Sequence, residues 1–400
     1  MNISVVVVSR RRPVWLARCL KAIRQLDHPS FEVVVVADPK SLAVTDCADL
    51  KTVPFDIPNI SAARNLGLCS AAGDLCVFID DDAVPEPLWL RHHEDAITHT
   101  GAVASVGYVR GRNGISFQSQ VHSVDREAET HEERATGDCP HVPELQAGRA
   151  LKLVGTNMAI KRSKLCEIGG FDEALRYFLD DSDISIRLAG SGAKCAVAPL
   201  AEVHHAFAPS ERRTSLRAPV SLFDIGRSSA IFFRRHDSGD LDELFTRIMR
   251  RERARLERHM VAGTCEPRDI ATILKTLKDG WSDGLVDALS DLSEIQPQAA
   301  DFRPVHPIPP GHVVLQSRLL RRRRALARAE DVAKKSARVS LFSFSLTPVR
   351  HHVRYTETGV WLQTGGQFGR TCRNANFFKW CRFAERLKEE SARVAKIRGI

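Results

Sequence analysis

Two kinds of hydrophobic pattern alternate along the first 80 residues: continuous apolar runs and apolar residues at helical spacing. Residues 3–9, 31–38 and 74–80 are short runs of mostly apolar residues, typical of strands buried on both faces. Residues 13–26 and 59–73 place apolar side chains at helical spacing. The order strand, helix, strand, helix, strand predicts right-handed crossovers and a mainly parallel sheet that helices cover on both faces.

The pattern continues beyond residue 80 with less regularity. Residues 87–101 read as a helix and 103–111 as a strand, whereas 118–150 are polar, charged and poorly periodic. That stretch fits a loop over a binding site or an ordinary surface loop. Residues 153–175 predict a strand, a helix and a Gly-Gly turn, and 221–292 are helical in pattern.

Polar residues follow the predicted strands where each one ends, at Ser9, Asp38 and Asp80. Ligands of parallel sheets bind beyond the C-terminal ends of the strands. In an extended segment Asp80 and Asp82 project together, while Asp81 points away. Two carboxylates on one cleft suit Mg²⁺ or Mn²⁺, which complete their shells with substrate phosphates and water. Alternatively, the three acids begin the next helix, where negative charge is favourable.

Composition and length allow several domains in these 400 residues, of which 43% are hydrophobic. The ten cysteines lack CxxC or zinc-type spacing, which predicts reduced thiols. We see no secretory signal pattern and no apolar run of about 18 residues, so we expect a cytoplasmic protein. The expected units are a nucleotide-binding α/β domain at 1–210, a helical extension at 211–295, a linker with five prolines at 296–312, and a basic module at 313–400.

The net charge of +9 comes from the last quarter of the chain, because residues 311–400 contain 20 Lys and Arg against 6 Asp and Glu. This excess of positive charge predicts an anionic partner, which could be membrane lipid, nucleic acid or a polyanionic substrate. Aromatic residues lie among these cations and would suit an interfacial helix on an anionic membrane: Phe377, Phe378, Trp380 and Phe383. The alternative is a packed helix with a basic outer face.

The first 210 residues or so resemble the family-2 glycosyltransferases, which have the GT-A fold. The resemblance rests on the order and spacing of short motifs: ISVVVVSRRRP at 3–13, Asp38, ARN-x-G at 63–67, AAGD at 71–74, Asp80 with Asp82, GTNMAIKRS at 155–163, GGFDE at 169–173, DDSD at 180–183 and the His pair at 204–205. It implies a Rossmann-like, mostly parallel sheet flanked by helices, followed by a mainly helical C-terminal region.

The activity implied by this resemblance is metal-dependent inverting transfer of a sugar. The donor would be a nucleotide diphosphate sugar, and the acceptor a hydroxyl of a glycan or lipid-linked molecule in cell-surface polysaccharide or glycolipid synthesis. Asp181 matches the family's catalytic base. Asp82 matches the direct metal ligand, with Asp80 reaching the ribose or the metal through water. His204 or His205 would add a metal contact, and we prefer His204.

The resemblance also implies contacts to the nucleotide sugar from Ser9, Asp38, Arg64, Asp80 and Asp81. Asn157 and Asp180 would lie on the acceptor side. Each position has a structural alternative: the acids at 180–183 suit the first turn of a helix, the histidines suit buried hydrogen-bonded sites, and Arg64 suits an exposed helix surface. Because Pro39-Lys40-Ser41 replaces the family's usual residues after the strand-two acid, the nucleotide is not predicted.

Two hypotheses of other classes compete with this interpretation. A nucleic-acid-binding protein would use the basic aromatic tail, but the ordered carboxylates would remain unexplained, so nucleic acid is not an expected partner. A catalytically silent carbohydrate-binding GT-A module is disfavoured because Asp80, Asp82 and Asp181 are intact. We therefore expect a cytoplasmic enzyme, with peripheral contact between residues 313–400 and the inner face of the plasma membrane.

Overall fold

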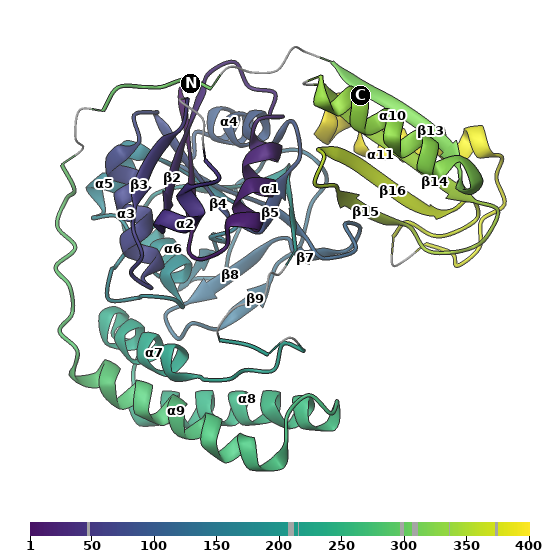
Figure 1. Cartoon of the computed structure of the whole chain (residues 1–400). Coiled ribbons are helices and arrows are strands. Elements are labelled where there is room, and N and C mark those ends of the chain that lie inside the picture. Colours follow the sequence, from purple (N-terminus) through teal and green to yellow (C-terminus); the bar gives the residue numbers. More distant parts are fainter. Residues whose placement is uncertain are drawn as a thin grey trace.

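The computed structural model describes residues 1–45, 49–206, 212–214, 216–296, 300–305, 311–335, 337–372 and 375–400. An N-terminal α/β domain carries a layer of three long helices on one side and a second, smaller α/β module on another (Figure 1). Within these residues no helix is both long and apolar enough to cross a bilayer.

The N-terminal domain is built on a sheet that has nine strands among the described residues, in the order β3-β2-β1-β4-β11-β6-β12-β5, with β7 beside β6. Pairing is parallel among β3, β2, β1 and β4 and antiparallel on both sides of β11. The strands are β1 (Ile3–Ser9), β2 (Phe31–Ala37), β3 (Lys51–Pro54), β4 (Leu75–Asp80), β5 (Ala83–Pro85), β6 (Ala104–Arg110), β7 (Phe117–Ser119), β11 (Met158–Lys161) and β12 (Cys195–His205).

Helices cover both faces of this sheet (Figure 1). The apolar residues of β1, β2 and β4 are therefore buried on both faces of the sheet. The predicted class, a mostly parallel sheet flanked by helices with a helical region after it, is confirmed. Flanking helices are α1 (Pro13–Ile23), α2 (Pro39–Leu42), α3 (Ile60–Ser70), α4 (Trp89–Thr100), α5 (Arg162–Glu167) and α6 (Asp180–Gly190).

Strand register brings the predicted polar residues to one edge of the sheet. Val8 of β1 pairs with Asp80 of β4, and Ser9 pairs with Ala37, the residue before Asp38. Parallel strands end at the same edge, so the side chains that follow them converge there.

Residues 118–150 differ from the loop expected in this stretch. They contain β8 (His122–Asp125) and β9 (Thr130–Glu132), which pair with β10 (Arg149–Leu151) in a small antiparallel sheet. Val124 of β8 is buried. Strands this short show little hydrophobic periodicity, which is why the sequence did not predict them.

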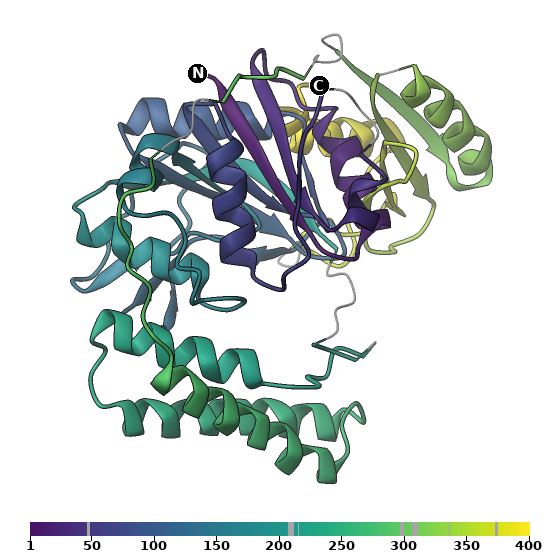
Figure 2. The same cartoon turned by 60° about the vertical axis from the view of Figure 1, so that its left-hand side comes forward.

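Three helices lie beneath the α/β domain in both views (Figures 1 and 2). They are α7 (Phe223–His236), α8 (Leu241–Val261) and α9 (Pro267–Val286). Helices α7 and α9 touch backbone to backbone, because a Cβ on Gly280 would lie 2.0 Å from the carbonyl oxygen of Phe223. Phe233 and Trp281 pack in the shared core.

The last module contains a four-stranded sheet that the sequence analysis did not predict. Its strand order is β13-β14-β16-β15, with β13, β14 and β16 parallel. Its elements are β13 (His312–Arg318), η1 (Leu319–Arg321), α10 (Arg322–Lys334), β14 (Arg338–Ser345), β15 (His352–Tyr355), β16 (Val360–Gly366) and α11 (Phe383–Arg398). The expected aromatic interfacial helix is thus only partly helical, because α11 begins at Phe383.

The proline-rich segment at 296–312 lies partly outside the described residues. Within it, residues 300–305 run against β2 without regular secondary structure. The Val305 amide donates to the Phe31 carbonyl oxygen over 2.9 Å, and the Arg303 amide donates to Glu32 over 2.9 Å. This part of the segment therefore packs on the α/β domain.

Candidate active site

Two carboxylates and one imidazole meet at the end of β4. One ligand atom each from Asp80, Asp82 and His205 lies within 4.8 Å of the others. His205 Nε2 is 3.2 Å from Asp82 Oδ1. Burial opposes protonation of this imidazole, but the hydrogen bond to Asp82 and the charges of Asp82 and Asp80 together outweigh burial and raise the pKa of His205. Hard carboxylate oxygens with one imidazole fit a divalent cation such as Mn²⁺.

Strand pairing decides which histidine reaches this group. In the antiparallel pair of β12 with β5, His205 lies opposite Ala83, next to Asp82, and His204 lies opposite Val84. Successive side chains of a strand point to opposite faces, so the two histidines diverge.

His204, which we preferred as the metal contact, does not face the carboxylates Asp80 and Asp82. Its Nε2 is 2.8 Å from Glu86 Oε1, and its ring packs 4.9 Å from that of Trp361. Burial lowers the pKa of His204 despite the opposing effect of Glu86. The structure therefore corrects the choice between the two histidines.

Asp81 lies apart from Asp80 and Asp82, beneath the end of β1. Ser9 Oγ donates to it over 2.7 Å, and Arg12 Nη1 donates over 2.8 Å. Burial raises the pKa of Asp81 to about 6, although Arg12 and Ser9 oppose that shift. The hydroxyl of Ser9 is thus engaged with a neighbouring side chain, and Arg12 also lies 3.9 Å from Asp82.

Arg64 is a buried cation between the two acidic segments of the site. It forms an ion pair with Asp180 and lies 3.6 Å from Asp80, while its guanidinium covers the ring of Phe171. The exposed position considered for Arg64 is therefore not observed. Burial raises the pKa of Asp180 to about 6; Arg64 opposes this shift and Asp181 adds to it.

Asp181 lies on the first turn of α6, beside the loop before β11. The Gly155 amide donates to its Oδ2 over 3.3 Å, and the next residue, Thr156, donates through its hydroxyl to Asp80. Adjacent residues thus contact Asp181 and Asp80. Acidic groups about a hundred positions apart in sequence converge at one site.

Asp38 caps the N-terminus of α2. Its carboxylate accepts from the backbone amides of Lys40 and Ser41 and from the Ser41 hydroxyl, and the Arg11 amide donates to it as well. Burial opposes ionisation, but these hydrogen bonds outweigh it and lower the pKa of Asp38. Both carboxylate oxygens already have partners within the protein.

Asn157, expected on the acceptor side, lies inside the domain and is fully buried. Its Oδ1 accepts from Trp89 Nε1 over 2.7 Å and contacts His93 Nε2 at 2.9 Å. Its Nδ2 donates to the carbonyl oxygens of Tyr108 and Ala201. These contacts join α4, β6 and β12, so the acceptor-side expectation for Asn157 is wrong.

Several residues near the carboxylates carried no clear sequence signal. Thr156 lies within the GTN motif, but its hydrogen bond to Asp80 depends on the fold. Arg217 follows β12 outside any motif. Burial lowers the pKa of Arg217, and three neighbouring arginines, Arg112, Arg213 and Arg255, add to this shift, while Asp82 opposes it.

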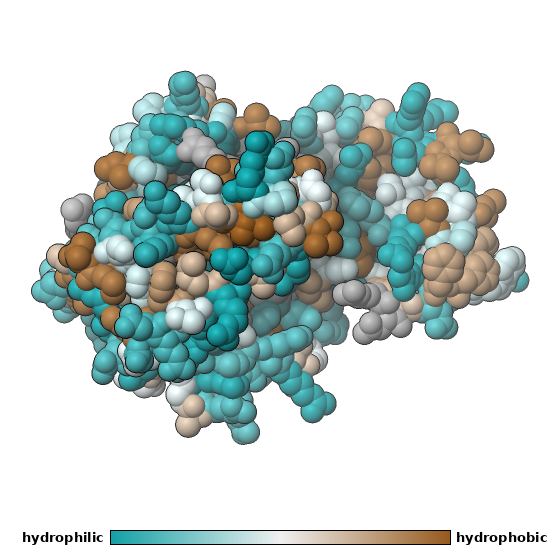
Figure 3. Space-filling view, turned by 90° about the horizontal axis from the view of Figure 1, so that it is seen from below, coloured by the Kyte–Doolittle hydropathy of each residue, from teal (hydrophilic) through white to brown (hydrophobic). Residues whose placement is uncertain are grey.

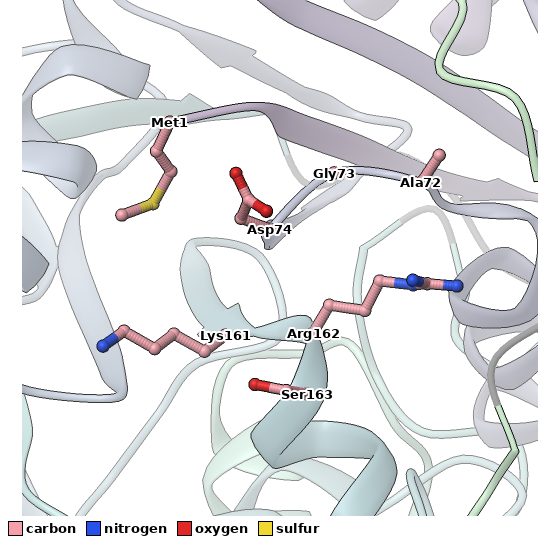
Figure 4. Close-up of a pocket in the computed structure, with 7 residues that line it drawn as sticks. All are labelled: Met1, Ala72, Gly73, Asp74, Lys161, Arg162 and Ser163. Atoms are coloured by element: carbon pink, nitrogen blue, oxygen red, sulfur yellow. The ribbon is translucent and has the colours of Figure 1, made fainter.

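A surface pocket elsewhere in the domain is separate from this site (Figure 4). Met1, Asp74, Lys161 and Ser163 are among the residues that line it. Met1 precedes β1 and Asp74 precedes β4, so the pocket lies at the N-terminal edge of the parallel strands. The carboxylates lie at the opposite edge.

Comparison with known proteins gives a family match and a curated relative. The family described as "Glycosyltransferase like family 2" matches residues 1–218. The succinoglycan biosynthesis protein ExoM of Rhizobium meliloti (strain 1021) is 32% identical over 138 residues, which cover 31% of this chain and 44% of that protein. The match thus spans less than half of that relative.

Two solved structures are similar to part of this chain. TarS 1–349 of S. aureus in complex with UDP-GlcNAc has a TM-score of 0.45 and 17% identity, covering 71% of this chain and 80% of that chain. GalNAc-T7 with UDP, GalNAc and Mn²⁺ has a TM-score of 0.45 and 16% identity, covering 61% of this chain and 53% of that chain.

Proposed function

Because the chain belongs to glycosyltransferase family 2 and is therefore a glycosyltransferase, we propose that it performs metal-dependent transfer of a sugar with inversion at the anomeric carbon. The donor is a nucleotide diphosphate sugar. The supporting observation is the convergence of Asp80, Asp82 and His205 with Asp181 at one end of the sheet.

The metal site in this proposal comprises Asp82 and His205, with Asp80 as a ligand or as the partner of a bound water. The donor set fits Mn²⁺ or Mg²⁺, and the imidazole favours Mn²⁺. A bound cation would neutralise charge that develops on the diphosphate leaving group. Arg12, 3.9 Å from Asp82, adds positive charge on the same side.

Asp181 is the general base in this proposal. Its hydrogen bonds to Gly155 and Ser182 are long, 3.3 and 3.4 Å, which leaves the carboxylate available to an acceptor. The acceptor oxygen bonds to the anomeric carbon as its proton moves to Asp181, and the bond to the diphosphate oxygen breaks with its electron pair leaving on the nucleotide. Asp180 cannot share this role, because Arg64 occupies it.

In this proposal the nucleotide sugar is contacted by the residues that the sequence resemblance named. Asp38 borders the donor site at the end of β2, while Ser9, Arg64 and Asp81 shape it from β1, α3 and the turn after β4. We assign Asp180 to positioning Arg64. Residues 1–210 form the catalytic domain in this proposal, with additions at 211–295 and 313–400 joined through 296–312.

A glycan or lipid-linked acceptor in cell-surface polysaccharide or glycolipid synthesis fits the partial match to a succinoglycan biosynthesis protein. The cation cluster around Arg217 suits a phosphate-bearing donor or acceptor. Basic residues in 313–400 suit contact with an anionic membrane, where a lipid-linked acceptor would be available.

The test is Asp181→Asn, which keeps the shape of the side chain and removes the base. We expect turnover to fall by about 10²- to 10⁴-fold, while nucleotide-sugar binding in calorimetry with Mn²⁺ stays within about twofold. Asp279→Asn, at an exposed position of α9, is the matched control and should match the original protein in both assays. Near-normal turnover of Asp181→Asn would rule out this base.

A further inference from the structure

Four chain segments meet at one edge of the C-terminal sheet. Arg318 of β13 pairs with Phe344 of β14, which pairs with Gly365 of β16. Because these strands are parallel, the residues that follow them leave at the same edge. A fourth segment, 377–381, is bound to this edge, since the Lys379 amide donates to the Phe368 carbonyl oxygen over 3.0 Å.

Large apolar side chains are exposed in three of these segments, those that follow β13 and β14 and the segment 377–381. We call them the apolar end, and they comprise Leu319 (49% exposed), Leu320 (98%), Leu346 (69%), Val349 (60%), Phe377 (61%), Phe378 (51%) and Trp380 (77%). The parallel strands of the module carry this edge away from the N-terminal domain (Figure 1). Figure 3 shows brown side chains among teal ones at the outer end of the module.

Packing fixes the aromatic side chains in outward positions. The Trp380 ring stacks flat on Phe368, with centroids 5.1 Å apart and an angle of 5° between the rings. Phe378 packs 5.4 Å from the same Phe368 ring. Beneath them, Arg318 covers the ring of Phe383 at 4.0 Å. The exposed rings therefore stand on an ordered base.

Cations surround these apolar side chains. Four arginines, 321–324, follow Leu320 directly and are exposed, and Arg350 follows Val349. Lys379 and Arg382 flank the Trp380 segment. Acids are fewer here: Glu389 pairs with Lys379 at 2.8 Å, and Glu385 accepts from the Arg382 amide. The edge as a whole is positively charged.

We propose that the apolar end docks on an anionic lipid bilayer, with Leu320, Phe377 and Trp380 entering the interface and the arginines 321–324 contacting lipid phosphates. Aromatic and aliphatic side chains beside Lys and Arg are the composition that binds such interfaces. Alkyl side chains such as Leu320 and Leu346 suit hydrocarbon, whereas a glycan or nucleic acid is bound through stacking, hydrogen-bonding and charged groups and makes no use of exposed alkyl side chains. Docking is independent of sugar transfer.

The test is sedimentation of the whole protein with vesicles of phosphatidylcholine alone or mixed with phosphatidylserine. We expect binding to the mixed vesicles that weakens as salt rises. The double variant Leu320→Ser, Trp380→Ser should bind at least about tenfold more weakly, because it removes two inserted side chains. Val261→Ser, Val286→Ser is the matched control: these valines are 85% and 83% exposed but lie at the ends of α8 and α9.

Both double variants change exposed residues, and thermal unfolding will verify that they fold alike. Asp181→Asn should bind vesicles as the original protein does, which separates docking from transfer. Equal vesicle binding by the two double variants would overturn the proposal. So would no vesicle binding by the original protein, or a loss through Leu320→Ser, Trp380→Ser that appears only with RNA or soluble glycan as the ligand.

Discussion

At the scale of single residues, one step along β12 separates two histidines with different environments. His205 meets Asp82, whereas His204 meets Glu86 beside the C-terminal module. Strand alternation therefore places a candidate metal ligand next to a structural hydrogen bond. A change at either residue should affect a different property of the protein.

We expect His205→Gln to weaken Mn²⁺ binding at least about tenfold, comparable to the loss of a supporting partner at other metal sites. His204→Leu should leave Mn²⁺ binding unchanged and lower the free energy of unfolding by about 1 to 3 kcal/mol, because Glu86 loses a buried hydrogen-bond donor. Calorimetric titration with Mn²⁺ and urea unfolding of both variants will measure the two effects. If His204→Leu weakened Mn²⁺ binding and His205→Gln did not, His204 would be the metal ligand.

The sequence identified most of these residues but could not orient them. The acids at Asp80, Asp82 and Asp181 were recognisable from motif order. The choice between His204 and His205 depends on the register of β12 with β5, and a shift of one residue reverses it. Asn157 was misassigned because its motif says nothing about burial, which arises from partners on α4, β6 and β12.

At the scale of elements, α4 is joined to the sheet through a buried polar cluster. His93 lies between Ser105 and Asn157, at 2.8 and 2.9 Å, and its ring packs edge-on to Trp89. Burial lowers the pKa of His93 to about 4, and its hydrogen bond with Asn157 only partly opposes that shift. The helix is therefore joined to β6 through a neutral imidazole.

This cluster predicts acid sensitivity. An unfolded histidine has a pKa near 6.5, so the unfolded chain binds a proton first as the pH falls, and stability is lost between about pH 6.5 and 4. The contribution of His93 is on the order of 3 kcal/mol. Urea unfolding across this range should show a shallower pH dependence for His93→Gln. Identical pH dependence of the two proteins would contradict the prediction. Burial also lowers the pKa of His312 to about 4, but His312 is present in both the original protein and His93→Gln, so its effect cancels in the comparison.

Elements with long periodic runs were predictable and short ones were not. β1, β2 and β4 carry continuous apolar runs, and the three long helices have clear helical spacing. Strands β8, β9 and β10 have only three or four residues each, so no period is visible. In strand β14, RVSLFSFS, the apolar residues Leu341 and Phe342 are adjacent, so the alternation of apolar and polar residues is broken.

At the scale of the whole molecule, a buried ion pair joins the C-terminal module to the N-terminal α/β domain. Both oxygens of Glu86 accept from Arg398, over 2.8 and 2.9 Å, and the guanidinium covers the ring of Trp361. Burial opposes ionisation of Glu86, but Arg398 and then His204 outweigh it and lower the pKa of Glu86. The same carboxylate contacts His204, next to the candidate metal ligand His205.

We expect Arg398→Ala to lower the free energy of unfolding by about 3 to 5 kcal/mol, because it leaves the Glu86 carboxylate buried without a cation. The double variant Glu86→Gln, Arg398→Met should cost less than this single change. Lys396→Ala is the control on the same helix: its ion pair with Asp138 is exposed, and unfolding should not change measurably. Equal effects of Arg398→Ala and Lys396→Ala would show that the pair does not stabilise the junction.

The distance between Glu86 and Arg398 along the chain also affects how the protein is made. The two residues are 312 positions apart. At translation rates of roughly 5 to 20 residues per second, a ribosome completes Arg398 about 15 to 60 s after Glu86. During that interval the nascent α/β domain contains a carboxylate that has not met its cation. Glu86 must stay hydrated until then, so the surface around β5 closes only after α11 has been synthesised.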